Sequence, residues 1–149
     1  SRLIVAAGGG AVWAADVGSC ATPGAVHVSD DGGKAWTTSP APGSVTRVQA
    51  DGPSTAFVVG GTRRCNYRLW ATTAGGVSWN GPRSGSATWG RSPKDDRVVQ
   101  RPDAAPTRPC AGRSPVLDLA PVGSSTATVL CGDGTVRRTT DGGRRGTRC

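Results

Sequence analysis

Few side chains in this sequence could act as a catalytic acid, base or nucleophile. His27 is the single histidine, and no G-x-S-x-G segment is present to supply the serine of a hydrolase triad. Asp95 and Asp96 offer two carboxylates, the minimum for glycoside hydrolysis, but adjacent residues of an extended loop point in different directions. We therefore predict no catalytic residue and assign this pair to a solvated, charged loop.

The five cysteines suit disulfides better than a metal site. None lies in a C-x-x-C pair, and His27 has no second ligand at a helical or hairpin spacing, so the sequence predicts no metal site. Disulfides form in oxidising compartments, which predicts a secreted or cell-envelope protein. The odd number leaves one thiol over, and the terminal Cys149 is the predicted one.

The charge of the chain is strongly positive. Eighteen Lys and Arg residues stand against ten acidic residues, all of them Asp, for a formal net charge of +8. Such a balance suits anionic partners, but the arginines are scattered and no nucleic-acid-binding motif accompanies them, so nucleic acid is not an expected partner. The glycine runs at 8–10 and 132–134 are not followed by helix patterns, so no nucleotide site and no cofactor are predicted.

Length and composition indicate one all-β domain. The chain has 149 residues, with 23 Gly and 11 Pro, which favours short strands and many turns over long helices. It begins at Ser1 and shows no signal peptide and no transmembrane run, which we interpret as a processed segment whose targeting information has been removed.

Three segments of the sequence follow one plan. Each reads as three short strands, a turn rich in glycine and a fourth strand, and the first two turns begin 43 residues apart, at Ser29 and Thr72. A four-stranded antiparallel unit with this period is typical of a β-propeller blade, which must stack on neighbours to bury its faces. The predicted blades cover residues of about 2–40, 45–82 and 115–149, and the insertion of about 83–113 is interpreted as a long loop that could hide a degenerate half blade.

The turns follow the pattern S/T-x-D-x-G-x-x-W, which resembles the Asp-box, or BNR repeat, of sialidases, sortilin-type receptors and photosystem assembly factors. The first turn is complete, the second has Ala74 in place of the aspartate, and the third has Gly146 in place of the tryptophan. The residues that match the pattern are Ser29, Asp31, Gly33, Trp36, Thr72, Gly76, Trp79, Thr139, Asp141 and Gly143.

The resemblance implies a structural role for these turns. In the family the Asp-box lies on the rim opposite the ligand, so Asp31 and Asp141 are expected to build the fold. Gly33 supplies a positive φ, Asp31 accepts turn amides, and Trp36 is expected to pack between adjacent sheets, which contributes about 2 to 3 kcal/mol. Sialidase chemistry needs a tyrosine activated by a glutamate, and the single Tyr67 has no glutamate to activate it.

The loops opposite the turns are the expected binding face. Cys20, Cys65 and Cys131 stand near the end of the second strand of each repeat, and the insertion brings Cys110 to the same face. We predict disulfides there and favour Cys20–Cys65 and Cys110–Cys131, provided that neighbouring blades bring the Cα atoms within about 7 Å. The candidate ligand-binding residues on this face are Arg63, Arg64, Trp89, Arg91, Arg97 and Arg101.

The function predicted from the sequence is a non-catalytic, secreted binding or assembly module for a protein, glycan or other anionic ligand. The alternative is a fragment of an Asp-box glycoside hydrolase whose catalytic residues lie mostly outside this chain. Three blades do not close a ring of about four to eight, so self-association or further blades are also expected.

Overall fold

The structure is a computed structural model that describes residues 3–139 and 146–148 of the chain. These residues form fifteen β-strands in four antiparallel sheets and no helix. The described residues therefore contain no helix that is long and apolar enough to cross a membrane. The prediction of an all-β fold made of blade-type sheets is confirmed. The chain divides into two compact units, residues 1–84 and 85–149, which are taken in turn.

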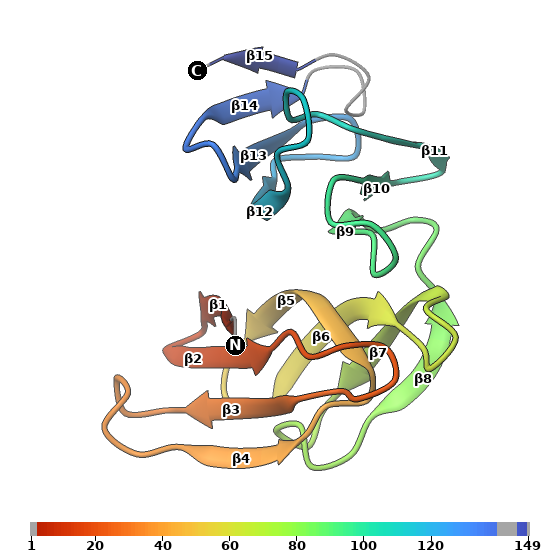
Figure 1. The fold of residues 1–149 in the computed structure, drawn as a ribbon. Coiled ribbons are helices and arrows are strands. Elements are labelled where there is room, and N and C mark those ends of the chain that lie inside the picture. The colour runs from red at the N-terminus through yellow and green to blue at the C-terminus, as the bar shows by residue number, and fades with distance from the viewer. Residues whose placement is uncertain (1–2, 140–145, 149) are drawn as a thin grey trace. The chain divides into compact units, whose positions relative to one another are not determined.

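The first unit contains two four-stranded sheets, each with its strands in the order of the chain (Figure 1). The first sheet consists of β1 (Leu3–Gly8), β2 (Ala11–Asp16), β3 (Ala25–Ser29) and β4 (Thr37–Pro40). The second sheet consists of β5 (Ser44–Asp51), β6 (Thr55–Gly61), β7 (Tyr67–Thr72) and β8 (Asn80–Ser84). This up-and-down order is the one that a propeller blade has.

One face of each sheet packs on the other to form the core of the first unit. The alternation of apolar residues along the strands directs one set of side chains to this core, as the period of two in a β-strand requires. From the first sheet come Ile4, Trp13 and Val26, and from the second come Val58 and Trp70, all buried. Trp13 is fully buried, and its ring meets that of Trp79 edge to face, with centroids 6.4 Å apart.

The turn of residues 29–36, between β3 and β4, is closed by its own side chains. The Asp31 carboxylate accepts hydrogen bonds from Lys34 N (3.0 Å), Ala35 N (2.9 Å) and Ser29 Oγ (2.8 Å). Ser29 Oγ in turn accepts one from Gly33 N (2.8 Å), and Gly33 has φ 93°. The hydrogen bonds from Ala35, Ser29 and Lys34 lower the pKa of Asp31. Asp31 is therefore an acceptor that satisfies turn amides.

The second turn, residues 72–79, keeps the two hydrogen bonds to the hydroxyl of its first residue. Thr72 Oγ1 accepts hydrogen bonds from Ala74 N (3.0 Å) and Gly76 N (3.1 Å), and Gly76 has φ 85°. Ala74 provides no carboxylate. The third turn lies mainly outside the described residues, which include Thr139 at the end of its strand but neither Asp141 nor Gly143.

Trp36 does not pack between sheets as the sequence predicts. Its side chain is 44% exposed, and its indole N–H donates to Gly33 O (3.0 Å) within the same turn. Trp79, at the same place in the second turn, does pack on the neighbouring sheet through Trp13. The difference has a physical reason: the second sheet faces the first, whereas the first sheet has no sheet of this unit on its other side.

The second unit contains a three-stranded and a four-stranded sheet. The predicted insertion holds the small sheet, whose strands β9 (Gly90–Arg91), β10 (Val99–Arg101) and β11 (Ala104–Thr107) lie in the order β11-β10-β9. The large sheet consists of β12 (Val116–Pro121), β13 (Ala127–Cys131), β14 (Val136–Thr139) and β15 (Gly146–Arg148). The buried core of this unit includes Trp89, Val99, Val116 and Val129.

One tryptophan contact recurs in the two units. The indole N–H of Trp13 donates to Gly52 O (2.9 Å) in the β5–β6 turn, which belongs to the next sheet. The indole N–H of Trp89 donates to Gly123 O (2.8 Å) in the β12–β13 turn, which again belongs to the next sheet. The three-stranded sheet therefore joins its neighbour in the same way as a complete blade does.

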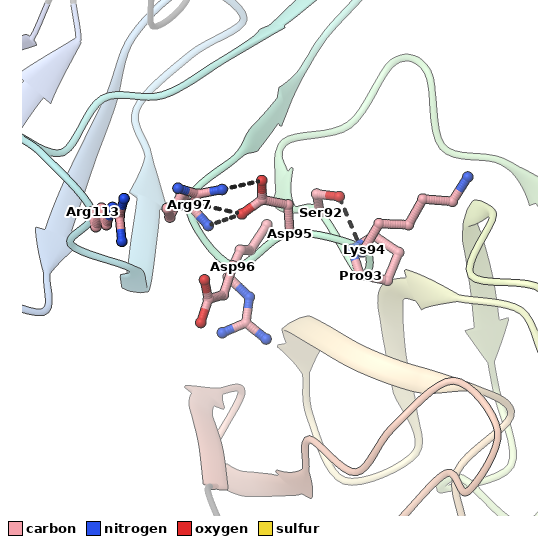
Figure 2. Close-up of a pocket in the computed structure, with 8 residues that line it drawn as sticks. Ser92, Pro93, Lys94, Asp95, Asp96, Arg97 and Arg113 are labelled. Atoms are coloured by element: carbon pink, nitrogen blue, oxygen red, sulfur yellow. Dashed lines mark hydrogen bonds and ion pairs between the residues drawn. The ribbon is translucent and has the colours of Figure 1, made fainter.

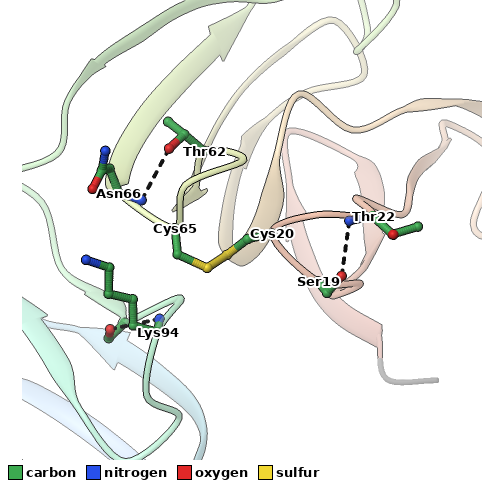
Figure 3. Close-up of a disulfide and its surroundings, with 8 residues drawn as sticks. Ser19, Cys20, Thr22, Thr62, Cys65, Asn66 and Lys94 are labelled. Atoms are coloured by element: carbon green, nitrogen blue, oxygen red, sulfur yellow. Dashed lines mark hydrogen bonds between the residues drawn. A yellow bond between two sulfur atoms is a disulfide. The ribbon is translucent and has the colours of Figure 1, made fainter.

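Two disulfides brace the loops at the end of the second strands. Cys20 in the β2–β3 loop is bonded to Cys65 in the β6–β7 loop, with Cα atoms 5.3 Å apart (Figure 3). The flanking loops are closed by hydrogen bonds from Thr22 N to Ser19 Oγ and from Asn66 N to Thr62 Oγ1. Cys110 is bonded to Cys131, with Cα atoms 5.7 Å apart. The predicted disulfides are thus present, in the pairing that the sequence favours.

Candidate functional site

The candidate site is a polar pocket of about 670 Å³ in the second unit. It lies over the loop between β9 and β10 and is completed by the segment that precedes β12. The hydrogen bond from Val116 N to Asp96 O (2.7 Å) ties this segment to the loop. The residues that line the pocket are Arg91, Ser92, Pro93, Lys94, Asp95, Asp96, Arg97 and Arg113.

Asp95 and Arg97 form the fixed centre of the pocket. Arg97 donates from its backbone N (3.0 Å), from Nε (3.1 Å) and from Nη2 (3.2 Å) to the Asp95 carboxylate (Figure 2). Arg108 adds a further contact to Asp95 Oδ2 at 3.3 Å. These bonds, those of Arg97 first, lower the pKa of Asp95 to about 2. Asp95 is therefore ionised at neutral pH and occupied as an acceptor, so it cannot act as a general acid.

The remaining charges leave the pocket positive. Its lining holds four cationic side chains and two carboxylates, and the Asp95–Arg97 pair is neutral in itself. Figure 2 shows Arg113 and Lys94 on opposite sides of that pair. Both side chains are exposed, and that of Lys94 extends away from the pair. The arrangement suits the binding of a carboxylate, sulfate or phosphate group by charge-assisted hydrogen bonds.

The residues that the sequence assigned to one binding face belong to two different units of the chain. Arg91 and Arg97 line the pocket, whereas Trp89 is 3% exposed and belongs to the core of the second unit. Arg63 and Arg64 are exposed in the β6–β7 loop of the first unit, beside Cys65. Arg101 lies on β10, and its Nε donates to Ala105 O across the β10–β11 hairpin.

Lys94 and Arg113 are pocket residues that sequence reasoning missed. Lys94 directly precedes Asp95 and Asp96, and a run of charged residues of this kind is typical of a solvated loop. Arg113 lies sixteen residues beyond Arg97, and nothing local to it indicates a site. A usable signal was the disulfide at Cys110, since a bridge to Cys131 fixes the segment that carries Arg113.

His27 and Tyr67 are further side chains of a type that can serve in catalysis. His27 Nδ1 lies 2.9 Å from Thr38 Oγ1 and its Nε2 lies 3.3 Å from Asp16 Oδ2, so the ring joins three strands of the first sheet. Burial raises the pKa of the Tyr67 phenol, while the Arg47 charge lowers it in part. Tyr67 is therefore protonated at neutral pH. In the described part of the chain no group of three or more His, Cys, Asp or Glu side chains could hold a metal ion.

Comparisons with known proteins gave structural similarities alone. No protein-family model matches the chain, and no curated protein matches it. A solved structure described as YCF48 bound to D1 peptide is similar at 15% identity and a TM-score of 0.44, over 97% of this chain and 64% of that one. YCF48 from Cyanidioschyzon merolae is similar at 16% identity and a TM-score of 0.42, over 93% of this chain and 66% of that one. The chain thus spans slightly less than two thirds of either structure.

Proposed function

We propose that this chain is a non-catalytic binding module built on Asp-box propeller blades, and that the 91–113 pocket binds an anionic group of a protein or glycan partner. The observation that supports the proposal is the excess of cationic side chains in that pocket, where Arg97 already neutralises Asp95. Lys94 and Arg113 then provide the charge for a ligand. In this proposal the turn at 29–36 is an Asp-box with a structural role, because the Asp31 carboxylate accepts hydrogen bonds from the amides of its own turn.

The proposal includes a location outside the cytoplasm. Two disulfides in a chain of this size are typical of proteins that fold in an oxidising compartment. Arg63 and Arg64 are proposed as a further basic contact for the same class of ligand, because both are exposed beside the Cys20–Cys65 bridge. The blades are proposed at residues 2–40, 45–82 and 115–149, with the insertion at 83–113 carrying the pocket.

The binding proposal is tested by fluorescence anisotropy with two labelled probes, an acidic oligo-glutamate peptide and a sulfated glycan fragment. The variant Lys94→Ser/Arg113→Ser should bind the preferred probe about tenfold more weakly for each lost contact, since a contact to a charged group contributes about 1.5 to 3 kcal/mol. Affinity should also fall as salt is added, because exposed charges are screened.

A matched control separates a local site from the overall charge. Lys34→Ser/Arg83→Ser removes the same two charges from exposed positions of the first unit and should leave affinity unchanged. Equal losses in the two variants, or unchanged binding by Lys94→Ser/Arg113→Ser, would contradict a site at the pocket. An Arg63→Ala/Arg64→Ala variant that binds as well as the wild type would remove that loop from the site. The glycoside hydrolase alternative requires turnover of fluorogenic glycosides, which the proposal does not expect.

A further inference from the structure

In the first unit, the sheet β5–β8 packs one of its faces on the sheet that precedes it in the chain, β1–β4. Val12 pairs with Ser29 in the first sheet, as Ala56 pairs with Thr72 in the second, so the two sheets can be matched position by position. The ladders of β1 with β2 and of β5 with β6 extend the match. The matched pairs are Leu3 with Val45, Val5 with Val48, Ala14 with Val58, His27 with Trp70 and Trp36 with Trp79.

Most of these matched positions are buried in the second sheet and exposed or half-buried in the first, where Ala14 is the buried exception. In the second sheet they face the first sheet, and the exposed fractions are 0% for Val45, 6% for Val48 and 0% for Val58. In the first sheet they form its outer face, and the exposed fractions are 54% for Leu3, 57% for Val5 and 44% for Trp36. The outer face of β1–β4 therefore has apolar residues where a buried blade interface has them, with the polar His27–Asp16 contact beside them, and no sheet of its own unit lies on it.

The large sheet of the second unit, β12–β15, has an exposed face that corresponds to the other side of a blade, the side that packs on the next blade in the chain. Leu130 pairs with Val136 as Ala15 pairs with Val26, so its outer face matches the face that the first sheet presents to the second. Leu130 and Val136 are 39% and 41% exposed. They line a hollow of about 260 Å³ together with Asp118 and with Thr128, which stands at the place of Trp13.

The two open faces complement each other in shape. In the buried interface of the first unit, Trp13 on one sheet meets Trp79 of the next. At an interface between the two open faces, Thr128 would stand in place of Trp13 and Trp36 in place of Trp79. The small side chain leaves the hollow, and the exposed indole is the group that fits it.

One pair of matched positions across the two faces is also complementary in charge. Val28 and Ala74 line one pocket at the interface of the first unit. The residue matched to Val28 on the large sheet of the second unit is Arg138, and the residue matched to Ala74 is Asp31. An interface of the same geometry would therefore bring a guanidinium beside the acidic turn that contains Asp30 and Asp31.

We propose that copies of this chain associate head to tail, with the outer face of β1–β4 of one copy on the outer face of β12–β15 of the next. Trp36 of one copy occupies the hollow over Thr128 of the other. The interface is heterologous, because the face that complements β1–β4 is a different surface of the molecule. The partner is a second copy, since this chain itself carries the face whose shape and charge match.

The experiment measures the mass of the 149-residue chain by light scattering and sedimentation over a range of concentrations. Wild-type protein should exceed the mass of one 15.0 kDa chain as concentration rises. Val5→Lys places a charge on the outer face of β1–β4, and Leu130→Lys places one on the outer face of β12–β15. Each variant alone should stay at the mass of one chain, because the new charge would be buried in the interface. Val122→Lys adds the same charge at a position that is 75% exposed, in the turn after β12, and should associate like the wild type.

Mixing the two variants is the decisive step. Each retains one intact face, so Val5→Lys and Leu130→Lys together should form a 1:1 complex of twice the mass of one chain. Urea unfolding of each variant checks that the fold is kept. A monomeric wild type, a variant that still associates alone, a mixture that forms no complex, or equal dissociation by Val122→Lys would each overturn the proposal. A monomeric wild type would also be the result if another blade of a longer polypeptide covered β1–β4.

Discussion

Restoring the missing carboxylate in the second turn should stabilise the first unit. In the first turn Asp31 accepts two backbone amides and the Ser29 hydroxyl. The second turn already has the backbone for this arrangement, since Thr72 accepts hydrogen bonds from Ala74 N and Gly76 N as Ser29 does from Asp31 N and Gly33 N. The variant Ala74→Asp should therefore form the Asp31-type bonds without a change of backbone.

The size of the gain follows from the bonds that are new. Val77 N already donates to Ala74 O (3.2 Å), so the carboxylate adds one full backbone bond and the bond to the Thr72 hydroxyl. At about 0.5 to 1.5 kcal/mol each, less the side-chain entropy of the aspartate, the net gain is about 1 kcal/mol. For a unit of this size that corresponds to a rise in Tm of about 4 to 8 °C.

The assay is urea unfolding followed by tryptophan fluorescence, in which the midpoint should rise while the m-value stays constant. The new carboxylate should have a lowered folded pKa, as Asp31 has. Its stabilisation is then complete above the unfolded pKa of about 3.9 and is lost as pH falls through the folded value. Thr73→Asp places the same charge at the position matched to Asp30 and should give no gain. Equal gains in the two variants, or a gain that persists in acid, would refute the reasoning.

Three further predictions concern the same fold. Asp31→Asn should lower the urea midpoint whereas Asp30→Asn should not, and the difference should vanish as pH falls through the lowered pKa of Asp31. Cys20→Ala/Cys65→Ala opens a loop with a sequence separation of 45 and should cost about 4 kcal/mol in non-reducing urea unfolding. Trp13→Phe leaves a turn carbonyl without its donor and should cost about 1 to 3 kcal/mol, whereas an unchanged midpoint would contradict the role of that bond.

The fold class could be predicted from the sequence because its signals are local. Alternating apolar residues indicate the strands, and turns rich in glycine mark where β3 and β7 end. The disulfides followed from the positions of the cysteines relative to those strands. The fate of Trp36 could not be predicted in this way, because its burial depends on whether a second sheet faces its blade.

The pocket was predicted only in part. Arg91 ends β9 and Arg97 lies in the loop that follows it, so their proximity can be read from the sequence. Arg113 comes from a distant segment, which the Cys110–Cys131 bridge ties to β13 and the hydrogen bond from Val116 N to Asp96 O ties to the loop. Trp89 lies outside the repeated turns and was interpreted as a surface residue, but its indole is needed for the next sheet. Long-range contacts of this kind leave no local pattern.

The recurrence of the tryptophan-to-turn hydrogen bond bears on how such a chain can diverge. A sheet of three very short strands keeps the same joint to its successor as a sheet of four. A sheet can therefore lack a fourth strand and a turn of the 29–36 type while one indole and one glycine carbonyl still join it to the next sheet. At the two places where it occurs, this joint is the same, whereas the sheets that it connects differ in the number and length of their strands.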